Sequence, residues 1–439
     1  MSRFTRPINK ALAGVLAALV FSSLFAVGCA KPPKLDAESL SDIRPAAIAS
    51  EPINVYKELG PASPHWVLFW VMTNAFEITR AVLLDADSAE MKATITTGIF
   101  PSIRSSSDGR ELYVPDTFNH GPERVRRDVL SIYDTADYSL IDKLELPKNQ
   151  RALMAPGARA RTAMIDEGRL LVLFNFSPRT SVTVIDPGAR KILNEIETPG
   201  CFLVYPTGRL GVSMLCGDGR LLTLRLDSEG QLVERTHSDA FFDPDDDPIN
   251  ESAAELDGVW YFASYGGDLY PVDLSGELPV FRPPWSLAVP SVEPTGFLSK
   301  LFADAPEGPW LPGGYQFAAA HESRGELYFL MHPTAWTQGQ GDHVFPGTEV
   351  WVYDVETKQR IRRLPLREMA GGFHITSDPQ PLLIAASFPP EVLASTGPAG
   401  PLLFSIDIYD AVTGEFLRDF RANGAAVYFV TPPGSEERQ

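Results

Sequence analysis

The sequence repeats one strand-turn-strand phrase along most of its length. In the clearest copy, residues 347–366 (GTEVWVYDVETKQRIRRLPL), β-branched and aromatic side chains alternate up to Asp354, a polar turn follows, and a second alternating run returns. Seven copies close the outward strand with an aspartate, at Asp85, Asp134, Asp186, Asp227, Asp273, Asp354 and Asp410. Successive members of this series are 49, 52, 41, 46, 81 and 56 positions apart. A strand-only unit of this period is typical of the blades of a β-propeller.

A glycine turn and a short apolar strand precede most of these aspartates, as in Asp108-Gly109 before ELYV. Such pairs supply the positive φ that tight hairpins require, so each unit holds about four strands. The 81-residue interval indicates one blade with an insertion. We therefore predict an all-β fold, a seven-bladed β-propeller over residues 61–439, with each aspartate acting as a turn residue. The last strand, residues 425–430, is expected to complete the first blade near residues 66–73, which leaves no open sheet edge at the ring closure.

The first 28 residues have the pattern of a secretory signal, with Arg3, Arg6 and Lys10 before an apolar stretch. Small residues precede Cys29, which is the arrangement of a bacterial lipoprotein signal, so lipidation is expected at Cys29. The alternatives are an ordinary signal or an uncleaved anchor. Residues 29–60 are interpreted as a tether. We expect a periplasmic, lipid-anchored protein, with the outer membrane favoured over the inner one because Ala30 follows the cysteine.

The charge balance excludes one class of partner. The chain has 38 Lys+Arg against 56 Asp+Glu, a formal net charge of −18. Removal of residues 1–28 takes away three cations and no acid, which gives −21. A protein that binds nucleic acid needs a basic face, so no nucleic-acid partner is expected.

The cysteine count bears on the compartment. With Cys29 assigned to lipid, Cys201 and Cys216 remain, on either side of a glycine turn within one hairpin. An exported chain meets an oxidising environment, so these two residues are predicted to form a disulfide. Two buried free thiols are the alternative.

No complete catalytic constellation or standard metal motif appears, so no catalytic residue and no metal ligand is predicted. His332 and His343 share one blade but have no standard ligand spacing, which favours a loop or interface role. The acidic stretch at 242–248 (FDPDDDP) lacks the spacing of a calcium loop and is interpreted as a solvated or partner-facing loop.

Large aromatic residues stand in the Pro/Gly-rich insertion between the fifth and sixth aspartates. Aromatic side chains on long loops are candidates for interface anchors. The interface candidates are Trp310, Tyr315, Trp336 and His343, with Trp285 nearby. The alternative is that these loops fold back onto the ring.

Several longer phrases resemble the heavy subunit of the quinoprotein amine dehydrogenases, the methylamine and aromatic amine dehydrogenase family. They are RRD leading into LSIYD at 126–134, the Cys201–Cys216 hairpin, FFDPDDDPI, YPVDLS, FRPPWSL, WLPGGYQ, and LMH followed by PGTEVWVYD. The resemblance covers roughly residues 60–430.

The resemblance implies a periplasmic seven-bladed propeller with no cofactor of its own and a disulfide between Cys201 and Cys216. It also implies a light subunit that carries tryptophan tryptophylquinone, in a complex of two heavy and two light subunits. That light subunit oxidises primary amines to aldehyde and ammonia and passes electrons to a small copper protein or a cytochrome. The family heavy subunit places a Phe at the substrate channel within a short phrase that corresponds to residues 98–102 (GIFPS) here; Ile99 occupies the place of that Phe, and Phe100 follows.

Three functions are consistent with the sequence. The leading hypothesis is the non-catalytic heavy subunit of an amine dehydrogenase, an enzyme only as part of that complex. The second is a membrane-tethered propeller that serves as a binding or assembly scaffold without a quinone light chain. The third, a stand-alone propeller enzyme, is the weakest because no catalytic spacing is present.

Overall fold

The structure is a computed structural model that describes residues 59–72, 79–98, 101–120, 125–147, 150–151, 159–288, 309–334, 345–388, 403–423 and 425–430. The chain divides into two compact units, 1–55 and 56–439, and all described residues belong to the second. They form strands and two short 3₁₀ turns, Arg159–Arg161 and Glu322–Arg324, and include no α-helix. No described helix is therefore long and apolar enough to cross a membrane. The all-β prediction is confirmed.

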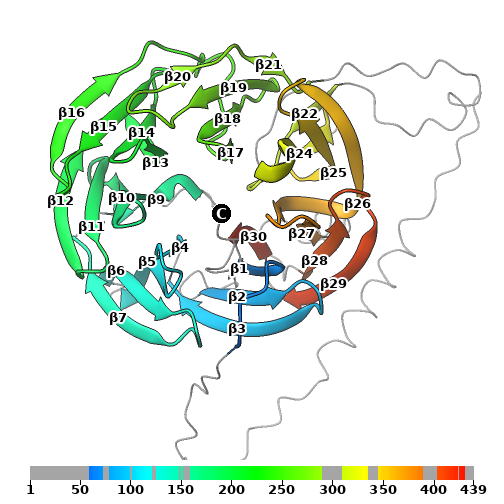
Figure 1. The fold of residues 1–439 in the computed structure, drawn as a ribbon, viewed down its shortest axis with the longest axis horizontal. Coiled ribbons are helices and arrows are strands. Elements are labelled where there is room, and N and C mark those ends of the chain that lie inside the picture. Colours follow the sequence, from blue (N-terminus) through cyan, green and yellow to red (C-terminus); the bar gives the residue numbers. More distant parts are fainter. Residues whose placement is uncertain are drawn as a thin grey trace, which may run out of the picture. The chain divides into compact units, whose positions relative to one another are not determined.

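Five separate sheets of four or five strands stand around a common centre (Figure 1). The first has the order β3-β2-β1-β30 and is built from β1 (Trp66–Met72), β2 (Thr79–Asp85), β3 (Glu90–Thr97) and β30 (Ala425–Val430). The second has the order β4-β5-β6-β7, with β4 (Arg104–Ser105), β5 (Glu111–His120), β6 (Val125–Asp134) and β7 (Leu140–Glu145). The strand pairings in both sheets are antiparallel.

The next three sheets follow in chain order. The third contains β8 (Gln150–Arg151), β9 (Thr162–Ile165), β10 (Leu170–Ser177), β11 (Ser181–Asp186) and β12 (Lys191–Glu197). The fourth contains β13 (Cys201–Thr207), β14 (Gly211–Cys216), β15 (Leu221–Leu226) and β16 (Leu232–His237). The fifth contains β17 (Ala254–Leu256), β18 (Val259–Ala263), β19 (Asp268–Asp273), β20 (Val280–Phe281) and β21 (Trp285–Ser286).

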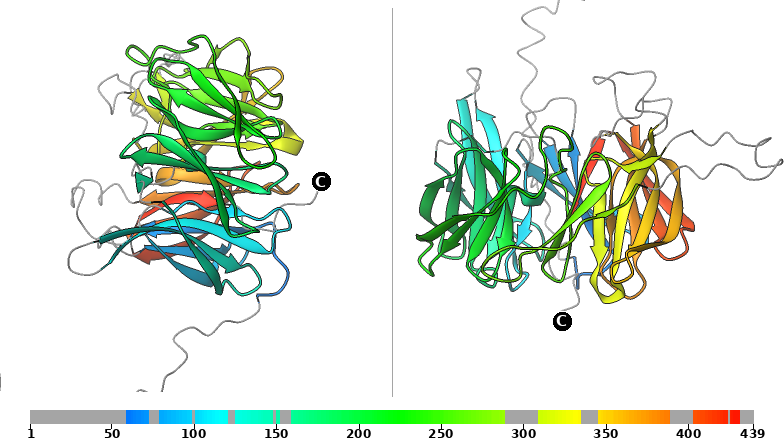
Figure 2. Two further views of the ribbon diagram at one scale, coloured as in Figure 1. Left: turned by 90° about the vertical axis from the view of Figure 1, so that its left-hand side faces the viewer. Right: turned by 90° about the horizontal axis from the view of Figure 1, so that it is seen from above.

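The remaining strands form one eight-stranded sheet. Its members are β22 (Trp310–Pro312), β23 (Ala318–His321), β24 (Glu326–Pro333), β25 (Gly347–Asp354), β26 (Gln359–Ile375), β27 (Leu382–Phe388), β28 (Leu403–Asp410) and β29 (Phe416–Asn423). The long strand β26 joins two halves, because residues 359–365 pair with β25, which also meets Ala370, and its last part pairs with β27 from Met369 onward. Figure 2 shows from the side that the strands run from one face of the ring to the other.

The two ends of the described chain meet in the first sheet. Strand β30 pairs antiparallel with β1, with Phe429 opposite Phe69 and Tyr428 opposite Trp70. The predicted closure by residues 425–430 is confirmed. The closed ring of antiparallel sheets makes the fold a β-propeller.

The seven aspartates lie at equivalent turns. Six are the last residue of their strand, and Asp227 follows β15 directly. Each carboxylate accepts a backbone N–H two to four residues further on; for example, Asp134 accepts from Ala136 at 2.8 Å and Asp354 from Thr357 at 2.8 Å. This is the Asx-turn chemistry expected of turn residues. The face of the ring that carries these turns is called the Asp face below.

Burial follows the position of a strand within its sheet. The middle strand β15 (LLTLRL) is buried at five of six positions, whereas the outer strand β16 (LVERTH) is exposed at five of six. Apolar side chains on both sides of the middle strands pack against neighbouring sheets. Tyr205 of the fourth sheet meets Trp260 and Phe262 of the fifth edge-on at 5.0 Å, a geometry worth about 0.5–1.5 kcal/mol beyond the buried area.

Candidate functional site

The face opposite the Asp face is the candidate functional face. Outer strands end there, and loops pass from them to the innermost strand of the next sheet; we call it the loop face. It carries Gly98 at the end of β3, the loop at 238–253, and both Cys201 at the start of β13 and Cys216 at the end of β14. The predicted channel phrase and the cysteine hairpin therefore lie on the same face.

Gly98 is held tightly by the neighbouring sheet. Its N–H donates to Asp116 Oδ1 at 3.1 Å, and its carbonyl accepts the Thr79 hydroxyl at 2.7 Å. A Cβ at this position would lie 2.2 Å from the carbonyl oxygen of Thr117, so only glycine fits this close backbone approach. Asp116 is fully buried, which makes this anchor part of the core.

The other end of the phrase is also fixed. The Ser102 hydroxyl lies 3.0 Å from the Thr162 hydroxyl of the third sheet, and its N–H donates to Pro115 O at 3.4 Å. Ile99 and Phe100, the two predicted channel-facing residues, lie outside the described residues. The structure thus fixes Gly98 and Ser102, the two ends of the channel phrase.

The RRD phrase forms a half-buried ion pair next to this anchor. Arg126 donates to both carboxylate oxygens of Asp128, at 2.9 and 3.0 Å, and the Thr117 hydroxyl donates to the same carboxylate at 2.6 Å. Asp128 is 7% exposed. Because Thr117 also packs on Gly98, the ion pair supports the strand that shapes the loop face.

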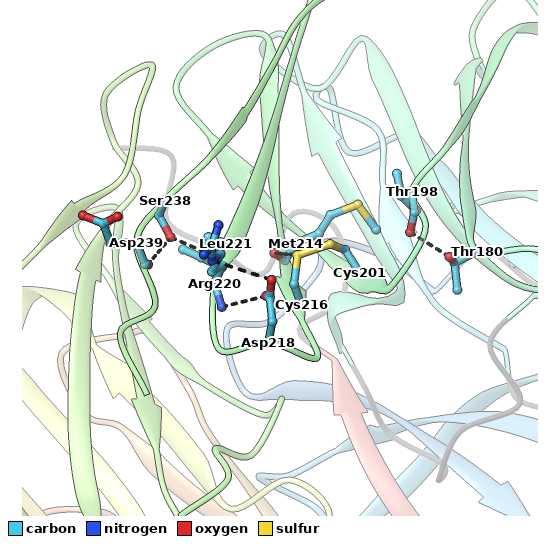
Figure 3. Close-up of a disulfide and its surroundings, with 10 residues drawn as sticks. All are labelled: Thr180, Thr198, Cys201, Met214, Cys216, Asp218, Arg220, Leu221, Ser238 and Asp239. Atoms are coloured by element: carbon cyan, nitrogen blue, oxygen red, sulfur yellow. Dashed lines mark hydrogen bonds and ion pairs between the residues drawn. A yellow bond between two sulfur atoms is a disulfide. The ribbon is translucent and has the colours of Figure 1, made fainter. Parts of the chain in front are cut away.

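The cysteine hairpin is disulfide-bonded, as predicted. Cys201 and Cys216 are directly opposite in the β13–β14 register, with an S–S distance of 1.97 Å (Figure 3). Both residues are buried. Turns on either side are held by hydrogen bonds from Thr180 to Thr198 O at 2.7 Å and from Leu221 N to the Ser238 hydroxyl at 2.9 Å (Figure 3).

Within the described ranges, one group of three potential metal ligands comes together: Cys201, Cys216 and His237. Both sulfurs are in the disulfide, so this group offers no thiolate to a metal. His332 is fully buried with its ring 5.0 Å from Phe345, while His343 lies outside the described residues.

The acidic stretch at 242–248 lies in the loop after β16. Asp243 Oδ1 accepts the N–H groups of Asp245 and Asp246 at 3.0 and 3.2 Å, and Asp247 accepts the Gly266 N–H at 2.7 Å. The Asp243 carboxylate thus shapes the loop itself and Asp247 ties it to the β18–β19 turn, while Asp245 and Asp246 are exposed.

The described interface candidates are packed within the propeller. Trp310 lies 5.4 Å from the Trp351 ring, with the Arg363 guanidinium 5.3 Å above it. Tyr315 is half-buried against the core of the first two sheets, and its N–H donates to Gly371 O at 2.7 Å. Both residues thus pack onto the ring, as the alternative describes, and their role at an interface stays a prediction. Trp336 lies outside the described residues.

The inner side of the ring holds charged groups that the sequence reasoning did not single out. Arg104 donates to Ile103 O at 3.0 Å and Thr162 O at 2.8 Å. Burial, together with the positive charge of Arg159, lowers the pKa of His374 to about 3, so this imidazole is neutral. Innermost strands are too short and irregular to show a periodic pattern, so no sequence signal pointed to these residues.

Two residues at the ring closure were also missed. Gln316 is 1% exposed, and His65 stands directly before β1. Neither belongs to a repeated phrase, and their importance follows from elements far apart in sequence.

The fold and the loop face define a β-propeller closed by its own two ends, with a disulfide-tied hairpin on one face. The sequence model described as methylamine dehydrogenase heavy chain (MADH) matches residues 69–427. The chain belongs to the methylamine dehydrogenase heavy chain family.

Individual relatives agree with this family. The chain is 28% identical over 436 residues to the methylamine dehydrogenase heavy chain of Methylophilus methylotrophus, which covers 97% of this chain and 96% of the relative. It is 25% identical over 356 residues to that of Paracoccus versutus, covering 81% and 76%. A solved structure of a functionally unknown protein from Desulfotomaculum acetoxidans aligns with a TM-score of 0.50 at 10% identity, covering 82% of this chain and 99% of that chain, which is a likeness of fold alone.

Proposed function

We propose that this chain is the heavy subunit of an amine dehydrogenase and that catalysis takes place on a light subunit bound to it. The observation that carries the proposal is the family match over residues 69–427, together with relatives named as heavy chains along nearly the whole length. The light subunit would carry tryptophan tryptophylquinone and oxidise a primary amine to aldehyde and ammonia. This chain supplies a rigid scaffold and contributes no cofactor.

The proposal includes seven blades. Five are the separate sheets, and the eight-stranded sheet counts as two blades that share the continuous strand β26. The seven Asp turns support this count, because Asp354 and Asp410 cap equivalent turns in the two halves of that sheet.

The loop face is the proposed docking surface for the light subunit. The phrase that resembles the family's channel phrase starts at Gly98, and the disulfide hairpin lies on the same face. Gly98 and Ser102 are each tied to neighbouring strands, so the residues between them start and end at fixed points. With Ile99 in place of the family's Phe, the channel is expected to admit a different range of amines.

The proposed compartment is the periplasm, with a lipid anchor at Cys29 in the outer membrane. The signal-like start of the sequence and the disulfide support export to an oxidising compartment. A complex of two heavy and two light subunits, with a small copper protein or a cytochrome as electron acceptor, completes the proposal.

The test is co-purification. The full chain would be extracted with detergent from membranes of its native host, captured by a C-terminal tag, and its partners stained for protein-bound quinone after denaturing electrophoresis. A small quinone-staining subunit at a one-to-one ratio supports the proposal. A chain that purifies without such a subunit contradicts it and supports the alternative of a tethered scaffold. Washing membranes with salt but no detergent tests the lipid anchor separately, because only an unanchored chain would be released.

A further inference from the structure

The seam where the ring closes contains a histidine held between two carboxylates. His65 precedes β1 on the Asp face. Its Nδ1 lies 2.8 Å from Asp87 Oδ1 in the same sheet, and its Nε2 lies 3.2 Å from Asp378 Oδ1. Asp378 belongs to the turn between β26 and β27, in the second half of the eight-stranded sheet. The imidazole therefore spans the first and last parts of the propeller.

Both acids are placed by other contacts. Asp378 is 6% exposed, and its carboxylate accepts the Thr376 hydroxyl at 2.6 Å and the Gln380 N–H at 2.9 Å. Asp87 is exposed, and its N–H donates to Asp85 at 3.0 Å. The Asp378 carboxylate is thus held by other contacts, whereas Asp87 is placed through its backbone and keeps an exposed carboxylate.

Two further charged or titratable groups face this cluster from neighbouring elements. Arg418 on β29 donates to Ala86 O at 2.8 Å and lies 4.0 Å from Asp87 Oδ1. His321, at the end of β23, has its Nε2 2.8 Å from the carbonyl oxygen of Asp378. The first sheet and both halves of the eight-stranded sheet therefore meet at this cluster.

The geometry favours the imidazolium form of His65. A neutral imidazole carries no charge, whereas the imidazolium donates to Asp87 through Nδ1 and also forms an ion pair with Asp378 through Nε2. Burial acts to lower the pKa of His65, but the hydrogen bond to Asp87 and the negative charges of Asp378 and Asp87 outweigh it and raise the pKa.

We propose that His65 is a pH-dependent latch on the closure of the propeller. In its protonated form it ties the first sheet to the Asp378 turn, and β1 and β30 stay closed against the rest of the ring. After it loses the proton, one of its two carboxylate contacts is lost and the seam opens more often. A group whose pKa is raised by folding stabilises the fold fully at low pH, and its contribution is lost as the pH rises through the folded-state pKa.

Hydrogen exchange followed by mass spectrometry on the intact, detergent-purified protein tests the latch. Protection of peptides covering 65–72 and 425–430 would be measured from pH 5.5 to 8.5 and corrected for intrinsic exchange, with residues 211–226 of the fourth sheet as internal reference. We expect protection at the seam to fall about two- to fivefold more than at the reference as the pH rises, as suits a partly exposed ion pair. In His65→Gln this extra fall is expected to vanish.

Two variants make the result decisive. His237→Gln changes an exposed histidine of the fourth sheet and should keep the wild-type profile. Asp87→Asn keeps the imidazole but removes one carboxylate, so the fall should begin at lower pH; this variant also serves if His65→Gln does not fold. The proposal is overturned if the protection of the seam peptides changes with pH as that of the reference peptides does. It is also overturned if Asp87→Asn has the same pH profile of protection as the wild type.

Discussion

The side-chain oxygen of Gln316 accepts the backbone N–H of Phe429 at 2.9 Å, across 113 positions of sequence. The backbone oxygen of Gln316 accepts the Phe373 N–H, also at 2.9 Å. One buried residue therefore binds the innermost strand of the last part of the ring and the C-terminal strand that completes the first sheet. Strand pairing and this contact close the ring together.

Gln316→Leu should destabilise the closure. The leucine is of similar size but leaves the Phe429 N–H buried without its acceptor, which costs about 1–3 kcal/mol. Urea unfolding gives the change in free energy, and exchange of the 425–430 peptide locates it. Gln359→Leu, at an exposed position on β26, is the matched control and should change the free energy by less than about 0.5 kcal/mol. Equal effects of the two substitutions would contradict this role.

The contacts of Glu326 predict that the fold loses stability at acid pH. Its carboxylate is 5% exposed and accepts from Arg362 at 2.6 Å, Arg324 at 3.0 Å and Tyr328 at 2.6 Å. Burial acts to raise the pKa of Glu326, but these three donors outweigh it and lower the pKa to about 2. Because folding lowers this pKa, the contribution is complete above the ordinary glutamate range and is lost as the pH falls towards 2.

Glu326→Gln should therefore cost about 1–3 kcal/mol at pH 7, since two partly buried guanidinium groups lose their counter-charge. The difference in free energy of unfolding between the variant and the wild type, measured by urea titration, should shrink as the pH falls from 5 to 2.5. Glu356→Gln, in an exposed turn, provides the comparison. If this difference in free energy stays constant over the pH range, Glu326 is not the source of the loss of stability at acid pH.

Loss of the disulfide should weaken the fourth sheet. Cys201 and Cys216 close a loop with a sequence separation of 15 residues, for which the chain-entropy estimate is about 3 kcal/mol. Replacing both cysteines by serine should lower the urea midpoint accordingly, and reduction of the wild type should reproduce the effect. A double variant as stable as the oxidised wild type would contradict this expectation.

Gly98→Ala should impair the loop face more than the fold as a whole. A methyl group there would meet the Thr117 carbonyl at 2.2 Å, so the backbone must move away from Thr117 and Asp116. Retention of the proposed light subunit in the co-purification should fall at least about tenfold, equivalent to 1.4 kcal/mol. Gly188→Ala, where the nearest atom is 3.6 Å away, is the control and should retain the partner. If Gly98→Ala retains the light subunit as well as the wild type does, Gly98 has no role in docking. The family assignment would still stand, because it depends on the sequence match.

Much of the fold could be read from local chemistry. An aspartate such as Asp134 or Asp354 stops a strand because its carboxylate captures nearby N–H groups, and this interaction spans only a few residues. Cys201 and Cys216 could be paired because they share one hairpin in a chain whose first residues predict export. The packing of Trp310 against Trp351, and of Tyr315 against the first two sheets, depends on how their loops fold, which local sequence does not encode.

The amino-acid sequence by itself determined the repeating all-β unit, the closing strand, the disulfide and the resemblance to the heavy-chain family. Each of these depends on side-chain alternation, turn chemistry or contacts within a hairpin. Only the tertiary structure decided that Gln316 meets Phe429, that His65 lies between Asp87 and Asp378, and that Gly98 is pressed against Thr117. These contacts join residues from different strands or sheets, and their geometry is set by ring closure and packing, which no periodic pattern along the chain records.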